Sequence, residues 1–101
     1  MPVTRLLLSV EQLSERDSAH ISRAIGTFLK AVSGELEPPE YWVALALYTY
    51  SEDVRDRILD AVPTDTRRKL QKAYSEITPV PFNRLAVAQA ALLHYGNLAA
   101  E

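Results

Sequence analysis

The sequence has 101 residues, a formal net charge of −2 and no cysteine. This length fits one domain with a single core, and the lack of cysteine excludes disulfides and thiolate metal sites. The slight negative charge argues against a general polyanion-binding protein. The apolar runs are too short for a secretory leader or a membrane span, so we expect a cytoplasmic chain without membrane insertion.

The first nine residues form a short apolar segment with a proline near its start. Three structures fit this segment: a strand, a first helical turn, or an intermolecular arm that packs on a neighbour. Ser9 followed by Gln12 has the spacing of a capping box, which indicates a helix start.

Apolar residues then recur at intervals of three, four and eight as far as Val32. This spacing predicts one buried helical face and a helix over about 11–32, with a break near Asp17 as the alternative. Gly34 stands where a left-handed C-terminal cap is expected.

The stretch 37–50, EPPEYWVALALYTY, predicts the central helix of the fold. Pro38 and Pro39 suit the first turn of a helix, and Glu37 and Glu40 place negative charge at the positive end of the helix dipole. Trp, Val and Tyr also favour a strand, but the alanines and leucines favour a helix. Because the stretch is apolar nearly all round, we expect it to be buried among other helices.

Two further helices follow. Ser51 is the predicted N-cap of a third helix that Pro63 ends, and Thr64 begins a fourth. On the third helix, Arg55 is among the residues expected to face water. The apolar positions of the two helices are Val54, Ile58, Ala61, Val62, Leu70, Ala73, Tyr74 and Ile77.

The segment 78–81 reads as a rigid extended connector, and the last helix is predicted to begin near Phe82 and to end at Gly96. Residues 97–101 are expected to fray. About five helices joined by short links predict a single all-α domain over 1–101. We expect it to be a compact right-handed stack with helical-repeat, armadillo-like character.

The run GELEPPEYWVALALYTYSEDVRDRILDAVPTDTRRKLQKA resembles the middle domain of the flagellar motor switch protein FliG, over residues 34–77. It is also similar to the N-terminal helical domain of MgtE-type magnesium transporters. In the family signature, an acid and His-Pro-Gln precede the apolar helix; here Pro38 stands for His and Glu40 for Gln. Pro63 falls at the family's helix-ending proline if one residue is inserted. The resemblance implies a docking surface for a partner ring protein around the turn that contains Pro38 and Glu40.

The polar residues offer little chemistry. His20 and His94 lack the spacing of a metal pair, and both are expected at the surface. Asp53, Asp56 and Asp60 share a helix face and suit a hard cation, but arginines interleave with them, so a solvated face is favoured. Neither a GxSxG turn nor a phosphate loop is present in the sequence. We therefore expect no enzymatic activity, no metal and no cofactor.

A basic run offers an alternative function. Arg67, Arg68, Lys69 and Lys72 follow a short turn, as in the second helix of a helix-turn-helix motif, so a small DNA-binding regulator is the second hypothesis. Nucleic acid is disfavoured because the domain is acidic overall.

The favoured hypothesis is a non-enzymatic protein–protein interaction module, a bacterial adaptor or scaffold in a motor- or secretion-type assembly. It would bind a protein partner or another copy of itself. The predicted partner-binding residues are those of the turn that opens the central helix: Glu37, Pro38, Pro39, Glu40 and Tyr41. The proline-stiffened turn loses little entropy on binding, and its two acids can steer a basic partner.

Overall fold

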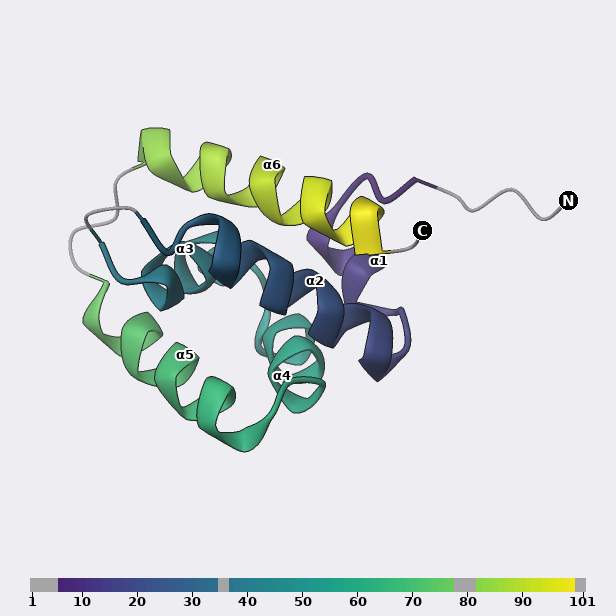
Figure 1. The fold of residues 1–101 in the computed structure, drawn as a ribbon, viewed down its shortest axis with the longest axis horizontal. Coiled ribbons are helices and arrows are strands. Elements are labelled where there is room, and N and C mark those ends of the chain that lie inside the picture. Colours follow the sequence, from purple (N-terminus) through teal and green to yellow (C-terminus); the bar gives the residue numbers. More distant parts are fainter. Residues whose placement is uncertain (1–5, 35–36, 78–81, 100–101) are drawn as a thin grey trace, which may run out of the picture.

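The computed structural model describes residues 6–34, 37–77 and 82–99, and every regular element in these ranges is an α-helix (Figure 1). The all-α prediction is therefore confirmed, whereas the repeat character stays a prediction. The connector predicted at 78–81 lies outside the described residues. The helices are α1 (Val10–Ser14), α2 (Ser18–Ala31), α3 (Pro39–Leu47), α4 (Glu52–Asp60), α5 (Thr64–Glu76) and α6 (Phe82–Ala99).

The predicted first helix is divided in two, as the alternative break near Asp17 required. Asp17 has extended backbone angles, and its Oδ1 accepts a hydrogen bond of 2.8 Å from the His20 backbone N–H. This bond satisfies one of the free donors of the first turn of α2, so Asp17 begins a new helix.

The N-terminal segment packs within the chain. The Ser9 Oγ accepts from the Gln12 backbone N–H at 3.3 Å, which confirms Ser9 as the cap of α1. The Gln12 side chain accepts in turn from the N–H of Leu8, at 2.7 Å. Leu7 is 3% exposed and belongs to the core, so residues 6–9 are a packed irregular segment and not a strand.

The cap predicted at Gly34 and the helix end predicted at Gly96 are both wrong. Gly34 does not have a left-handed backbone, and the C-cap of α2 is Val32, with φ −101°. Gly96 lies inside α6, where a Cβ would come within 2.9 Å of the Leu7 side chain. Gly96 thus permits a close approach of the N-terminal segment. Residues 97–99, expected to fray, continue the helix, and 100–101 lie outside the described residues.

Helix α3 occupies the centre that the sequence predicted. It contacts α2, α5 and α6, and the residues from Val43 to Leu47 are all buried. The helix ends at Leu47 and not near Tyr50, because residues 48–50 form a turn before the next cap. Trp42, near the start of α3, is only half-buried.

The start of α4 agrees with the sequence, because the Ser51 Oγ accepts from the Val54 N–H at 3.4 Å. One expectation for α4 is wrong: Arg55 does not project into water. It is half-buried, with its guanidinium carbon 4.5 Å from the centroid of the Tyr74 ring and Nη1 donating to the Tyr74 hydroxyl. The cation–π contact explains this position.

Helix α6 runs along one side of α2 and α3, and α4 and α5 lie on the other side (Figure 1). The core between them contains the largest fully buried side chains, Phe28, Leu13, Ile25, Leu45, Ile58, Leu70 and Leu92. Among the described residues, no helix combines the length and the apolar character needed to cross a membrane. With α6 as an outer helix, one of its faces is left toward solvent.

Candidate functional site

The predicted partner-binding residues lie together at the first turn of α3. Pro38 is exposed, and Glu37, Pro39, Glu40 and Tyr41 are half-buried. Pro38 takes the N-cap position without a side-chain hydrogen bond, and Pro39 is the first residue of the helix. The prolines and acids therefore do serve as the helix start, and most of the turn also remains partly accessible.

Glu37, one of the two acids of this turn, is already paired within the chain. Arg84, in the first turn of α6, donates from Nη1 to Oε1 of Glu37 at 2.5 Å. This hydrogen bond lowers the pKa of Glu37, and the same bond together with one to Tyr41 raises the pKa of Arg84. The ion pair joins the start of α3 to the start of α6, so the two helix ends form one surface.

Trp42 lies beneath this surface. Its ring meets Tyr41 edge to face, with centroids 5.5 Å apart, and the Arg84 guanidinium lies 5.9 Å from the ring centroid. The indole Nε1 is buried and has no hydrogen-bond acceptor among the described residues. A hollow of about 120 Å³ adjoins the Trp42 side chain. It is lined by Phe28, Val32, Trp42, Val87, Ala88 and Ala91. Trp, Tyr and Arg are the residues most enriched at binding hot spots.

Exposed apolar side chains lie along α6 and on the N-terminal segment beside its C-terminal end. In the ranges that the structure describes, five large hydrophobic residues are exposed: Leu6, Leu8, Phe82, Val87 and Leu98. Three of them belong to α6. The other two flank Leu7, whose backbone N–H donates to the Asn97 side chain near the end of α6, at 2.6 Å. Large apolar side chains exposed along one helix and the segment beside it make this part of the molecule the candidate interaction surface.

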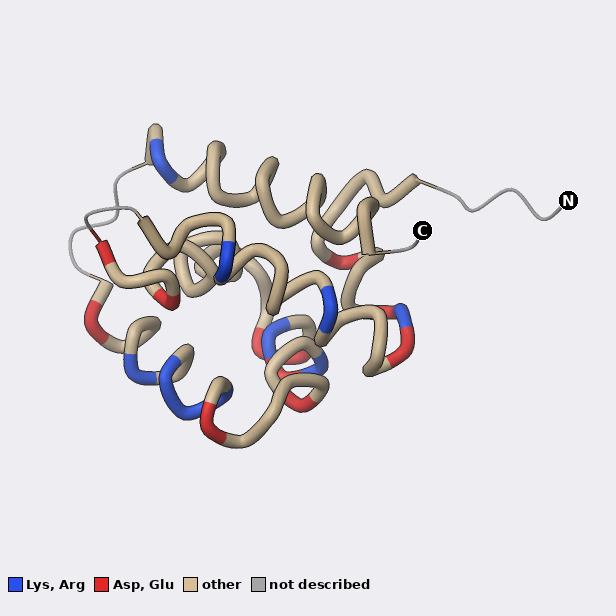
Figure 2. The backbone as a smooth tube through the Cα atoms, viewed as in Figure 1, with Lys and Arg blue, Asp and Glu red and all other residues tan. Residues whose placement is uncertain are grey.

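Helix α6 is also nearly free of charge. Its eighteen residues include one ionised side chain, Arg84, whereas α4 and α5 carry many acids and bases (Figure 2). The sequence contained this signal, since Arg84 is the one Lys, Arg, Asp or Glu in 82–99. The sequence analysis predicted the helix but no surface on it, because the chain order does not show that α6 is an outer helix.

The basic residues of the alternative hypothesis do not act as one set. Arg68, Lys69 and Lys72 are exposed on α5, but Arg67 is half-buried and forms a 3.1 Å ion pair with Asp60. This pair closes the α4–α5 turn. Three cations therefore remain at the surface.

The histidines differ from each other. His94 is exposed, as expected, but His20 is 7% exposed and its Nε2 lies 2.7 Å from the Gly96 carbonyl oxygen. The expectation of a surface position for His20 is wrong, because α6 covers it. Within the described part of the chain, no group of three His, Cys, Asp or Glu residues could hold a metal ion.

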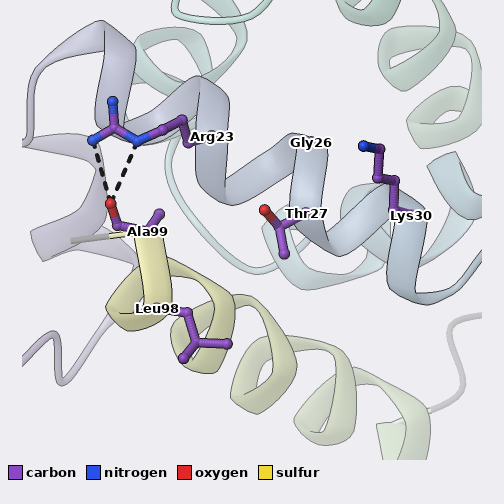
Figure 3. Close-up of a pocket in the computed structure, with 6 residues that line it drawn as sticks. All are labelled: Arg23, Gly26, Thr27, Lys30, Leu98 and Ala99. Atoms are coloured by element: carbon purple, nitrogen blue, oxygen red, sulfur yellow. Dashed lines mark hydrogen bonds between the residues drawn. The ribbon is translucent and has the colours of Figure 1, made fainter. Parts of the chain in front are cut away.

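An open groove follows the seam between α2 and the end of α6 (Figure 3). Its volume is about 420 Å³, and it is lined by Arg23, Gly26, Thr27, Lys30, Leu98 and Ala99. Arg23 donates from Nε and Nη2 to the Ala99 carbonyl oxygen at 3.4 and 3.3 Å. That contact satisfies a free carbonyl of the last turn of α6, where a positive charge is favourable.

The chain matches no family model, no curated protein and no solved structure. The resemblance of residues 34–77 to the FliG middle domain therefore stays a prediction that depends on the sequence letters.

Proposed function

We propose that this chain is a non-enzymatic protein–protein interaction module. Its binding surface combines the exposed side of α6 with the first turn of α3, from Glu37 to Tyr41. The observation that supports this most directly is the position of the exposed large hydrophobic side chains, all of which, among the described residues, lie on α6 or on the segment beside its end.

The free energy for binding would come from the apolar part of this surface. Phe82 is 77% exposed and Val87 is 62% exposed. Burying apolar area contributes about 25 cal/mol per Å², so covering such side chains favours association. The hollow beside Val87 and Trp42 offers a site for one apolar side chain of the partner.

The polar part of the surface would set the orientation of the bound partner. The paired Glu37 and Arg84 lie at the start of α6, and Glu40 belongs to the first turn of α3 that this pair joins to α6. Interfaces commonly have an apolar centre with a polar rim, and rim charges affect partner choice and association rate more than affinity. In this arrangement Glu40 is the acid left to steer a basic group of the partner.

The resemblance of residues 34–77 adds a biological setting to the proposal. It suggests a cytoplasmic adaptor or scaffold within a bacterial motor- or secretion-type assembly. The turn at Pro38 and Pro39 would then correspond to the docking turn of that family.

Site-specific photo-crosslinking tests the proposal. We would replace Val87 with p-benzoylphenylalanine, irradiate cells that produce the chain, and identify the adducts by mass spectrometry. The matched control carries the same residue at Gln71, which is exposed on α5. We expect discrete protein adducts from position 87 only. Adducts of equal yield from both positions, or none from position 87, would refute the proposed surface.

A further inference from the structure

The outward stripe of α6 consists of Val87, Ala90, His94 and Leu98, which are all exposed and lie three, four and four residues apart. This spacing places them on one side of the helix. The opposite side carries the buried residues Ala88, Leu92 and Gly96. The stripe therefore points away from the core.

We propose that this stripe binds the same stripe of a second copy of the chain, in an antiparallel two-fold contact. The inference rests on the proposed function, since it names the occupant of the α6 part of that surface.

The stripe carries no charge that would oppose contact with a second copy. The stripe has no ionised side chain, and Arg84, the one formal charge of α6, is paired with Glu37 of its own chain. A two-fold contact brings each surface against itself, so a charged stripe would repel its copy. This stripe brings no like charges together, because Glu40 and the Glu37–Arg84 pair lie outside it.

The order of the side chains is self-complementary when the two helices run antiparallel. Val87 and Leu98 lie at the two ends of the stripe, so reversing the direction sets Val87 of one copy against Leu98 of the other. Ala90 and His94 then pair across the two-fold axis. The small side chain of Ala90 lets the helices approach closely at their crossing point, where packed helices are typically about 8–10 Å apart.

The size of the contact predicts its strength. A contact formed mainly by one helix face buries less than the ~800 Å² per partner of standard stable complexes. The dimer is therefore expected to be weak and to depend on protein concentration. The groove of Figure 3 borders Leu98, and its floor at Gly26 and Thr27 leaves room for side chains of the second copy.

Sedimentation equilibrium over a concentration series tests the self-association. Ala90→Glu places a charge beside the axis from both copies, and the exposed site tolerates it because Glu is a good helix former. We expect the dimer dissociation constant to rise at least about tenfold, a change of ~1.4 kcal/mol. Gln71→Glu on α5 is the control and should leave the constant unchanged. Circular dichroism confirms that both variants are folded.

Disulfide trapping tests the direction of the helices, because the chain has no cysteine of its own. Val87→Cys and Leu98→Cys variants of different mass are mixed and oxidised gently. We expect a higher yield of the mixed disulfide-linked dimer than of either homodimer. The Gln71→Cys variant should form little disulfide-linked dimer with itself or with either of the other variants. Homodimers in a yield equal to that of the mixed dimer would contradict the antiparallel contact.

The two proposals fail in different ways. A wild-type chain that stays monomeric at all concentrations, or an Ala90→Glu variant that still dimerises, would overturn the second copy as occupant. In that case adducts to another protein from position 87 would leave the interaction module standing. The absence of any adduct from position 87, including one to a second copy, would remove both.

Discussion

The Nε2 atom of His20 donates a hydrogen bond of 2.7 Å to the carbonyl oxygen of Gly96, 76 residues later in the chain. The bond joins the first turn of α2 to the last part of α6 in a buried position. Since a carbonyl oxygen can only accept, Nε2 carries a proton in this bond.

This bond predicts a stability difference between the two histidines. His20→Ala would leave the Gly96 carbonyl without its donor and open a cavity, so we expect a loss of about 1–3 kcal/mol in the free energy of unfolding. His94→Ala is the matched control, because His94 is exposed, and it should change stability by less than about 0.5 kcal/mol. Urea unfolding followed by circular dichroism measures both. Equal effects would show that the His20 bond contributes nothing.

The two helical glycines are expected to respond in opposite directions. Gly26 lies in α2 with nothing within 4 Å of an added Cβ, so Gly26→Ala should stabilise the fold by about 0.5–1 kcal/mol. At Gly96 an added Cβ meets Leu7 at 2.9 Å and Leu13 at 3.4 Å, and Gly96→Val should cost about 1–3 kcal/mol.

Thermal unfolding of the glycine variants provides the measurement. Gly26→Val is the control for Gly96→Val, because it adds the same side chain at a site with free space. Its unfolding temperature should be close to that of wild type. A Gly96→Val variant as stable as Gly26→Val would mean that Leu7 does not pack against α6.

The ion pair between Glu37 and Arg84 predicts that the stability of the fold depends on pH in the acidic range. Because the hydrogen bond from Arg84 holds the pKa of Glu37 below its ordinary value of 4.5, the pair contributes stability above that value. The contribution is lost as the pH falls through the lowered pKa of the folded state. The difference in stability between wild type and Glu37→Gln should therefore shrink toward zero in acid.

An NMR titration of the Glu37 carboxyl carbon tests the cause directly. Arg84→Gln should move the pKa of Glu37 upward, toward its ordinary value, while Lys72→Gln on α5 should leave it unchanged. An unaltered Glu37 titration in Arg84→Gln would exclude the ion pair in solution.

The DNA-binding alternative makes a separate prediction. With Arg67 paired to Asp60, the exposed cations of α5 are Arg68, Lys69 and Lys72. We expect no tight binding of duplex DNA at physiological salt, and no effect on protein binding when Arg67, Arg68 and Lys69 are changed to Gln. Fluorescence anisotropy with a labelled duplex at several salt concentrations provides the check. Tight, salt-sensitive binding that the triple variant loses would favour the regulator.

The sequence by itself determined where most helices begin. Ser9, Ser51 and the proline–acid turn before α3 act through bonds and dipoles that reach only a few residues, so local letters suffice to identify them. The buried character of α3 was also readable, because a stretch that is apolar on all sides has to be covered.

Only the tertiary structure decided what the residues of distant segments do. From its neighbours alone Gly96 was predicted to end the helix, and only the approach of Leu7 makes it a packing residue inside α6. His20 is buried because α6 covers it, and Arg84 is neutralised because α3 begins beside it. The same holds for the candidate surface: α6 could be recognised as apolar, but which of its sides faces solvent depends on contacts between segments that the chain order does not bring together.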